Sequence, residues 1–214
     1  MTLPRLHAIV DADLAAAHGW SVPALGRAFL AGGARWLQLR AKQAPSGELL
    51  EWSAELAFDA HAAGALLVVN DRADVARLAG ADGAHVGQDD LTPRGARAVL
   101  GDAAMLGLST HTHAQIRAAI EEPVTYIAIG PVFGSVTKET GYDAVGLQMV
   151  RAAASAAEAA GAPALPVVAI GGITLDRAAE VIAAGAASVA VIGDLLRDGD
   201  PERRVFEYVE RLGR

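Results

Sequence analysis

The sequence predicts an α/β fold, a single (β/α)8 TIM barrel in which parallel strands are wrapped by helices. Eight short apolar segments alternate with longer stretches rich in Ala and Leu that have helical periodicity. Several apolar segments lack alternation with polar residues, as strands do when both faces of a parallel sheet are covered. A doubly wound sheet is the alternative, but eight strand–helix units in 214 residues favour a closed barrel.

The eight predicted strands are spaced regularly along the chain. In order they are Leu6–Val10, Ala34–Leu39, Ala65–Asn70, Gly83–Val86, Ala104–Leu108, Thr125–Ile129, Pro166–Ile170 and Ser188–Ile192. The helical stretches between them include Ser46–Ala63, Thr92–Leu100, Thr112–Glu121, Leu147–Ala160 and Thr174–Ala184. Glycines such as Gly64 and Gly185 end helices and start the return to the next strand. No linker or low-complexity tract interrupts the pattern, so one barrel domain is expected over residues 1–214.

Composition excludes several classes of function. The net charge is −7, so nothing draws the chain electrostatically to nucleic acid. No cysteine is present, which excludes disulfides and thiolate metal sites. Apolar runs stay far below the ~18 residues needed to cross a bilayer, and the N-terminal run is too short for a signal peptide. We expect a soluble cytoplasmic protein without nucleic-acid or membrane partners.

Polar side chains concentrate at the ends of the predicted strands, where barrel enzymes carry their active sites. Gln38, Arg40 and Lys42 end the second strand at two-residue spacing, so they point to one side while the strand persists. An amide and two cations on one side suit a diphosphate. A solvated strand end is the alternative.

Two carboxylates at the next strand ends suggest a metal site. Asp71 and Asp90 are 19 residues apart, about one strand–helix unit, and neighbouring strands lie ~4.8 Å apart. Mg²⁺ takes one or two protein carboxylates together with water and phosphate oxygens. Alternatively, Asp71 pairs with Arg72 or Arg40, Asp90 belongs to the start of the following helix, or Asp89 replaces it as ligand.

The last three strand ends predict phosphate binding. A long loop with hydroxyls and a lysine follows the sixth strand and includes Ser135, Thr137 and Lys138. Gly171-Gly172 follows the seventh strand and Gly193 the eighth, where backbone N–H groups of barrels frequently bind phosphate. An ordinary surface loop and tight turns are the alternatives. The histidines His85, His111 and His113 lack the spacing of a zinc site, and no nucleophile elbow precedes Ser109.

Taken together, these strand-end segments resemble the thiamine phosphate synthase family over about residues 6 to 195. The segments that carry the resemblance are Gln38-Leu-Arg-Ala-Lys42, Asn70-Asp-Arg-Ala-Asp74, Gly83-Ala-His-Val-Gly-Gln-Asp-Asp90, Gly107-Leu-Ser-Thr-His111, Tyr126-Ile-Ala-Ile-Gly-Pro-Val-Phe133, Thr137-Lys138 and Val168-Ala-Ile-Gly-Gly-Ile173. Their order and their placement at strand ends make the match specific.

The resemblance implies an enzyme that condenses hydroxymethylpyrimidine diphosphate with a thiazole phosphate and releases diphosphate. It implies a pyrimidine diphosphate pocket formed by Gln38, Leu39, Arg40, Ala41, Lys42, Asn70, Ser109 and Lys138, of which Arg40, Lys42, Ser109 and Lys138 are catalytic. It implies a thiazole phosphate site formed by Ser135, Val136, Thr137, Gly172, Ile192 and Gly193. Asp71 and Asp90 match the family's ligands for one Mg²⁺ per subunit. A homo-oligomer is compatible with this interpretation.

The chain departs from the family at two points of the thiazole phosphate site. Gly193 stands where the family often has Ser, which removes a hydroxyl but keeps the backbone N–H. Ser135 and Val136 also differ from the commoner loop with Thr and Pro. Rival interpretations are a thiazole tautomerase, a non-catalytic barrel that binds thiamine precursors, and another phosphate-handling barrel. Pro131 stands where the histidine of the tautomerase is expected.

Overall fold

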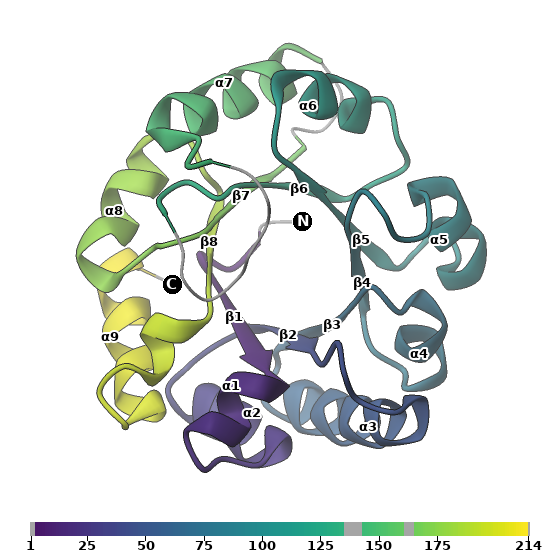
Figure 1. The fold of residues 1–214 in the computed structure, drawn as a ribbon, viewed down its shortest axis with the longest axis vertical. Coiled ribbons are helices and arrows are strands. Elements are labelled where there is room, and N and C mark those ends of the chain that lie inside the picture. Colours follow the sequence, from purple (N-terminus) through teal and green to yellow (C-terminus); the bar gives the residue numbers. More distant parts are fainter. Residues whose placement is uncertain (1–2, 135–142, 161–164, 214) are drawn as a thin grey trace.

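The fold is a closed barrel of eight parallel strands in the order β1 to β8, surrounded by helices (Figure 1). The computed structural model describes residues 3–134, 143–160 and 165–213. Each strand pairs in parallel with the next along the chain, and β1 also pairs with β8. The predicted barrel is confirmed, and the doubly wound sheet is wrong.

The strands match the predicted apolar segments closely. They are β1 (Leu6–Asp11), β2 (Trp36–Arg40), β3 (Leu66–Asn70), β4 (Gly83–Val86), β5 (Met105–Thr110), β6 (Tyr126–Ile129), β7 (Val167–Ile170) and β8 (Ser188–Val191). The main differences lie at the functional ends, where β1 and β2 run on to Asp11 and Arg40. These two polar residues are partners in the β1–β2 register, so the strands end in a polar pair.

Helices follow the strands, and five of them were predicted. Those are α3 (Ser46–Ala62), α5 (Pro93–Leu100), α6 (His113–Ile120), α7 (Gly146–Ala159) and α8 (Leu175–Ala183). The structure adds α1 (Ala12–Ala17), α2 (Val22–Ala31), α4 (Ala73–Leu78), the 3₁₀ turn η1 (Gly193–Leu196) and α9 (Pro201–Leu212). Side chains at strand ends start some helices: Asp11 accepts the N–H of Leu14, and Thr112 accepts that of Gln115.

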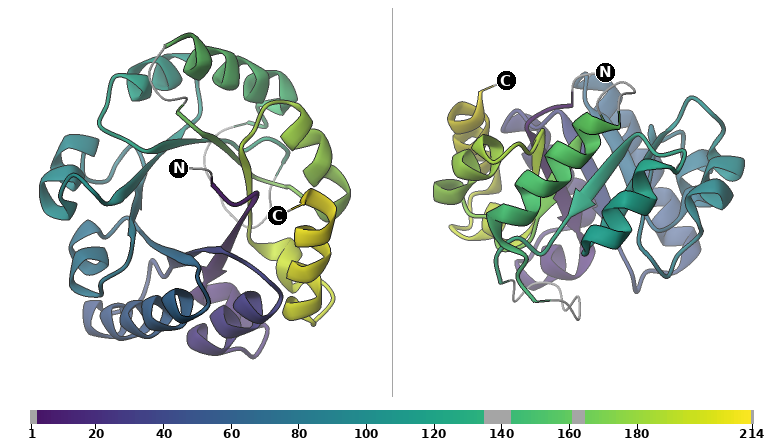
Figure 2. Two further views of the ribbon diagram at one scale, coloured as in Figure 1. Left: turned by 180° about the vertical axis from the view of Figure 1, so that it is seen from behind. Right: turned by 90° about the horizontal axis from the view of Figure 1, so that it is seen from above.

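Two separate hydrophobic clusters support the barrel. The larger one joins buried side chains of the strands to those of the surrounding helices. The smaller one fills the barrel interior and contains Leu3, Ile9, Trp36, Val68, Met105, Tyr126, Ala128, Val168 and Ala190. The segment leading into β1 lies across the barrel opening in the view from behind (Figure 2). The smaller cluster forms an apolar plug that closes the barrel from below. The polar side chains therefore lie above this plug, at the carboxyl ends of the strands.

No helix in the part of the chain that the structure describes is long and apolar enough to cross a membrane.

Candidate active site

The end of β2 presents Gln38 and Arg40 toward the barrel interior. Gln38 is buried, and its Nε2 lies 3.4 Å from Nε2 of His7. Arg40 forms an ion pair with Asp11 at the end of β1, a partner that the sequence analysis missed. The Arg40 Nε atom is buried and has no hydrogen-bond partner among the residues that the structure describes. Such an orphaned donor is available to an anionic ligand above the apolar plug.

The intervening residues of this segment point elsewhere. The side chain of Leu39 is fully buried in the cluster between strands and helices, and Ala41 packs against the same cluster. Because alternate residues of a strand face opposite sides, these two positions can offer a ligand only their backbone. Lys42 lies beyond the strand in the following turn, where its Nζ is 3.2 Å from Oδ2 of Asp71.

Asp71 and Asp90 approach each other, as their spacing predicted. Burial first, and then the neighbouring carboxyl of Asp90, raises the pKa of Asp71, while Lys42 opposes the shift. Asp71 also has a φ of 64°, an uncommon backbone conformation for a residue other than glycine. Asp90 accepts the N–H of Gly87 at 2.7 Å. Two carboxylates held together against their repulsion form a site suited to a cation.

The structure contains neither of the two alternative ion pairs of Asp71. Arg72 pairs with Asp74, and Arg40 pairs with Asp11, so neither neutralises Asp71. Among the described residues, no group of three or more His, Asp or Glu side chains is placed to hold a metal. A hard cation at Asp71 and Asp90 therefore needs water and substrate oxygens to complete its coordination, which is the usual arrangement for Mg²⁺.

Asn70, His85, Ser109 and Tyr126 line the floor of the same mouth. Asn70 is half-buried at the end of β3. Oγ of Ser109 lies 2.8 Å from Nε2 of His85, whose Nδ1 lies 3.0 Å from the hydroxyl of Tyr126. His111 bonds the carbonyl oxygen of Gly130 through its Nδ1 at 2.6 Å. His85 and His111 therefore take part in hydrogen bonds within the barrel mouth.

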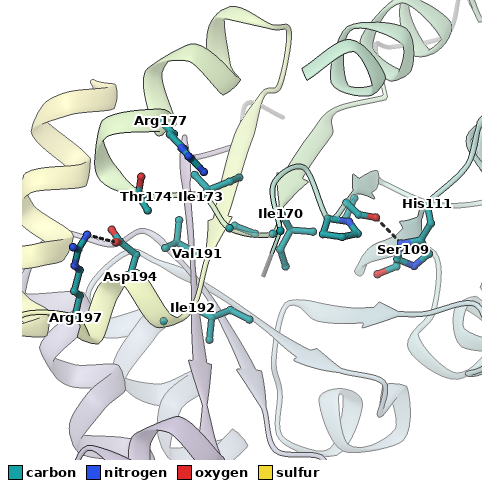
Figure 3. A pocket seen from close by; sticks show the side chains of 18 residues that line it. Ser109, His111, Ile170, Ile173, Thr174, Arg177, Val191, Ile192, Asp194 and Arg197 are labelled. Carbon is teal, nitrogen blue, oxygen red and sulfur yellow. Dashed lines mark hydrogen bonds and ion pairs between the residues drawn. The ribbon is translucent and has the colours of Figure 1, made fainter. Parts of the chain in front are cut away.

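A cavity of about 470 Å³ opens beside this floor, over the ends of β5 to β8 (Figure 3). Gly172, Ile192 and Gly193, which were assigned to the thiazole phosphate site, line it. Gly172 has a φ of 63°, and a Cβ atom there would lie 2.5 Å from the carbonyl oxygen of Gly134. The strand-seven turn therefore requires glycine, because the β6 loop approaches its backbone. Ser135, Val136, Thr137 and Lys138 lie outside the described residues.

Two arginines at this cavity were missed by the sequence analysis. Arg177 of α8 and Arg197 after η1 both line it (Figure 3). The guanidinium of Arg177 lies 4.5 Å from the ring centre of Phe133, and it forms no ion pair with any described residue. Arg197 lies 3.9 Å from a carboxylate oxygen of Asp194. The position of Arg177 three residues after Thr174, in the first turn of a helix that follows a strand end, was the available signal.

The barrel mouth contains two adjoining cavities. The inner cavity contains Gln38, Arg40, Asn70 and His85, and it shares five lining residues with the outer cavity. The shared residues are Ser109, Ala128, Ile170, Ala190 and Ile192. A polar cavity that contains Arg40 therefore adjoins a glycine-lined cavity across a mainly apolar boundary.

Comparison with known proteins agrees with this arrangement. The family model described as thiamine monophosphate synthase matches residues 6–195. The chain is 42% identical over 214 residues to a thiamine-phosphate synthase of Koribacter versatilis, covering 99% of this chain and 97% of that protein. It is 47% identical over 180 residues to a thiamine-phosphate synthase of Anaeromyxobacter dehalogenans, covering 84% and 78%.

A solved structure supports the same assignment. The thiamine phosphate pyrophosphorylase of Pyrococcus furiosus superposes with a TM-score of 0.84 at 29% identity, covering 98% of this chain and 95% of that one. The family match spans all eight strands and reaches the start of η1. The chain therefore belongs to the thiamine monophosphate synthase family.

Proposed function

We propose that this protein is a transferase that joins hydroxymethylpyrimidine diphosphate to a thiazole phosphate, releasing diphosphate and forming thiamine phosphate. The observation that carries the proposal is that two unlike cavities adjoin each other at one barrel mouth. One contains Arg40 and Asn70 beside the Lys42–Asp71–Asp90 cluster, and the other contains Gly172 and Gly193. A reaction that joins two phosphorylated substrates needs such adjoining sites.

The pyrimidine diphosphate is assigned to the inner half. Gln38, Asn70 and Ser109 offer hydrogen bonds, and Arg40 and Lys42 offer positive charge. Lys138 belongs to the same proposed pocket, and Leu39 and Ala41 contribute backbone only. Because the Asp11 carboxylate accepts from one terminal nitrogen of Arg40, the orphaned Nε and the remaining N–H groups can face a diphosphate.

Asp71 and Asp90 fit one Mg²⁺ per subunit. Their carboxylates lie together, and burial, followed by the neighbouring Asp90 carboxyl, raises the pKa of Asp71, so a cation bound there would relieve an unfavourable negative charge. When bound there, Mg²⁺ would supply neutralising charge to the diphosphate oxygens. The chain's own part is to hold the two carboxylates at neighbouring strand ends and to place Lys42 beside them.

The thiazole phosphate is assigned to the outer half, on Gly172, Ile192, Gly193 and the segment Ser135, Val136 and Thr137. Backbone N–H groups next to glycines can approach a phosphate closely, because glycine has no side chain to block the approach. The shared apolar residues Ile170 and Ile192 lie between the halves, where they would exclude water from the reacting carbon.

Bond cleavage in this scheme separates diphosphate from the methylene carbon of the pyrimidine, and the thiazole nitrogen then bonds that carbon. Little proton transfer is required, so the residues needed are those that stabilise the departing charge: Arg40, Lys42 and Lys138, with Ser109 as a hydrogen-bond donor. Removing one preorganised donor of this kind costs about 10²–10³ in rate in other enzymes.

The test is diphosphate release from the purified protein given both substrates, first with Mg²⁺ and then with EDTA. Release that requires both substrates and Mg²⁺ is the expected result. Isomerisation of thiazole phosphate alone would identify a tautomerase instead. Binding of either substrate without turnover would identify a sensor of thiamine precursors.

The proposal extends to the setting of the reaction. A single barrel domain over residues 1–214 would act in the cytoplasm on small-molecule substrates, without nucleic acid or membrane partners. Self-association into a homo-oligomer is compatible with this assignment.

A further inference from the structure

Two buried side chains behind Ser109 form a chain of hydrogen bonds whose direction the structure determines. His85 is on β4, Ser109 on β5 and Tyr126 on β6. Nε2 of His85 lies 2.8 Å from Oγ of Ser109, and Nδ1 of His85 lies 3.0 Å from the hydroxyl of Tyr126. The family resemblance assigned a role to Ser109 but none to His85 or Tyr126.

The backbone of β5 is built to let these two rings meet. Gly107 is the register partner of His85 on one side and of Tyr126 on the other. A Cβ atom at Gly107 would lie 2.1 Å from Cζ of Tyr126 and 2.4 Å from Nδ1 of His85. The rings lie 5.5 Å apart between centroids, at 26°. Glycine inside a strand often marks such a close approach, and here it leaves the space for the contact.

The direction of the hydrogen bonds follows from Tyr126. Its side chain is fully buried, and burial raises the pKa of its phenol, which therefore keeps its proton. Within the part of the chain that the structure describes, the only hydrogen bond of this hydroxyl is to Nδ1 of His85. A buried O–H requires an acceptor. Nδ1 must then carry the lone pair, and the proton of the imidazole must lie on Nε2.

With its proton on Nε2, His85 donates to Oγ of Ser109 and cannot accept the serine proton. Ser109 is therefore not activated as a nucleophile, which would require the opposite tautomer. Its own O–H is left to point away from His85, and Ser109 lines both halves of the barrel mouth. The backbone of Ser109 is held independently, because Nε2 of Gln88 donates to its carbonyl oxygen at 2.6 Å.

We propose that Tyr126 and His85 are positioning residues that fix Ser109 as a hydrogen-bond donor toward an anionic oxygen bound in the barrel mouth. On the proposed function, on which this identification of the ligand rests, that oxygen belongs to the diphosphate. A hydroxyl already oriented toward developing negative charge needs no reorganisation during the reaction. Hydrogen bonds to such charged acceptors are roughly twice as strong as neutral ones.

The tautomer of His85 can be measured without any substrate. The protein labelled with ¹⁵N in its six histidines would be compared by NMR with His85→Gln, which identifies the resonances of His85. We expect a protonated Nε2 and an unprotonated Nδ1 in the wild type. In Tyr126→Phe, which removes only the hydroxyl, we expect this preference to weaken. A wild-type His85 protonated on Nδ1 would overturn the proposal.

Kinetics then test the consequence. Gln places its amide N–H near the position of Nε2, so His85→Gln should keep kcat for diphosphate release within about threefold of the wild type. His85→Leu should lose about tenfold, and Tyr126→Phe about two- to tenfold, as expected for one hydrogen bond. The KM for thiazole phosphate should not change. Equal kcat in His85→Leu and His85→Gln would contradict the positioning role.

Ser53→Ala is the matched control. Ser53 is a fully buried residue of α3 whose hydroxyl donates to the carbonyl oxygen of Leu49, away from the barrel mouth. Its loss should lower stability but not kcat, which separates positioning from general destabilisation. If the wild type releases no diphosphate, the proposed function fails, whereas the NMR result still decides the direction of the hydrogen bonds.

Discussion

Asp71 combines two unfavourable features, a left-handed backbone and a carboxylate next to another carboxylate. Asn tolerates this backbone conformation better than Ala does, so Asp71→Asn is the cleaner test of the proposed metal site. We expect Mg²⁺-dependent turnover to fall more than about a hundredfold, by analogy with the loss of a preorganised electrostatic group. Asp89→Asn, which changes the exposed neighbour of Asp90, should remain active and serves as the control. Activity lost in Asp89→Asn but kept in Asp71→Asn would refute the assignment.

Asp71→Asn should lower turnover but raise the stability of the metal-free protein. Because burial and Asp90 raise the pKa of Asp71 above its ordinary value of 3.8, the folded state binds this proton more tightly than the unfolded state. Metal-free wild-type protein should therefore lose stability as pH rises from about 3.8 through the raised pKa. At neutral pH, Asp71→Asn without metal should be more stable than the wild type, by up to about 1 kcal/mol. Denaturant unfolding in EDTA at several pH values would measure this, and a destabilised variant at neutral pH would contradict it.

Arg177 is a cation beside the proposed thiazole phosphate site that forms no ion pair with a described residue. Gly193 offers a phosphate no hydroxyl, so we expect Arg177 to provide part of the recognition of phosphate. Arg177→Gln should raise the KM for thiazole phosphate about tenfold, the value of a weak charged hydrogen bond, and should leave kcat nearly unchanged. Arg177→Lys should recover part of the affinity. Arg117→Gln removes an exposed charge on α6 and should have no effect.

Much of the site could be predicted at the scale of the residue. The two-residue alternation of a strand shows which side chains share a side, and the length of a strand–helix unit shows which residues lie at neighbouring strand ends. Gln38 and Arg40 share a side, and Asp71 meets Asp90 one unit later. The pairing of Arg40 with Asp11 depends on β1 extending by one residue, which apolar patterning does not reveal. Leu39 was included with its neighbours by resemblance, although the period of two turns its side chain away from the mouth.

At the scale of the element, β5 illustrates how a single glycine determines which rings can meet inside the barrel. Gly107→Ala would force a Cβ atom into the contact between Tyr126 and His85. We expect a loss of about 1–3 kcal/mol in the free energy of unfolding, as for other overpacked cores. Gly47→Ala in α3 has open space around the new atom and should stabilise the protein by about 0.5–1 kcal/mol. Equal stabilities of the two variants, measured in urea, would show that β5 can move aside.

Strands and helices were predictable where a short stretch of sequence carries the pattern of apolar residues that identifies them. The strands are short aliphatic runs bounded by turn residues, and all eight were located to within a few residues. The helices α1 and α4 are only six residues long and carry too few apolar positions to show a period. Helix α9 is strongly amphipathic, but it follows the last strand. The eight-strand barrel is complete at that point, so the alternation of strands and helices does not predict another helix.

At the scale of the whole molecule, Asp194 connects the site to the closure of the barrel. Its largely buried carboxylate accepts from Arg204 at 2.8 Å and Tyr208 at 2.7 Å, both on α9, and from the N–H of Leu175 at the start of α8. Asp194→Asn should cost about 1–3 kcal/mol, because Arg204 keeps Glu207 at 3.1 Å but loses the charge of its shorter partner. The exposed pair partner Asp198 provides the control, since Asp198→Asn should cost less than about 1 kcal/mol. A similar cost for both variants in urea unfolding would argue against this connecting role.

Binding of diphosphate and Mg²⁺ should stabilise the entire barrel, because the proposed binding residues lie on strands around its circumference. Arg40 is on β2, Asp71 and Asp90 follow β3 and β4, and Gly172 follows β7. Inorganic diphosphate together with Mg²⁺ should raise the Tm more than either alone, and ligand at a hundred times its Kd adds about 2.7 kcal/mol to the free energy of unfolding. EDTA should remove the part that depends on the metal, and Asp71→Asn should lack that part from the start. If diphosphate raised the Tm equally with Mg²⁺ and with EDTA, the arginine and lysine side chains alone would bind it, and the two aspartates would have another role.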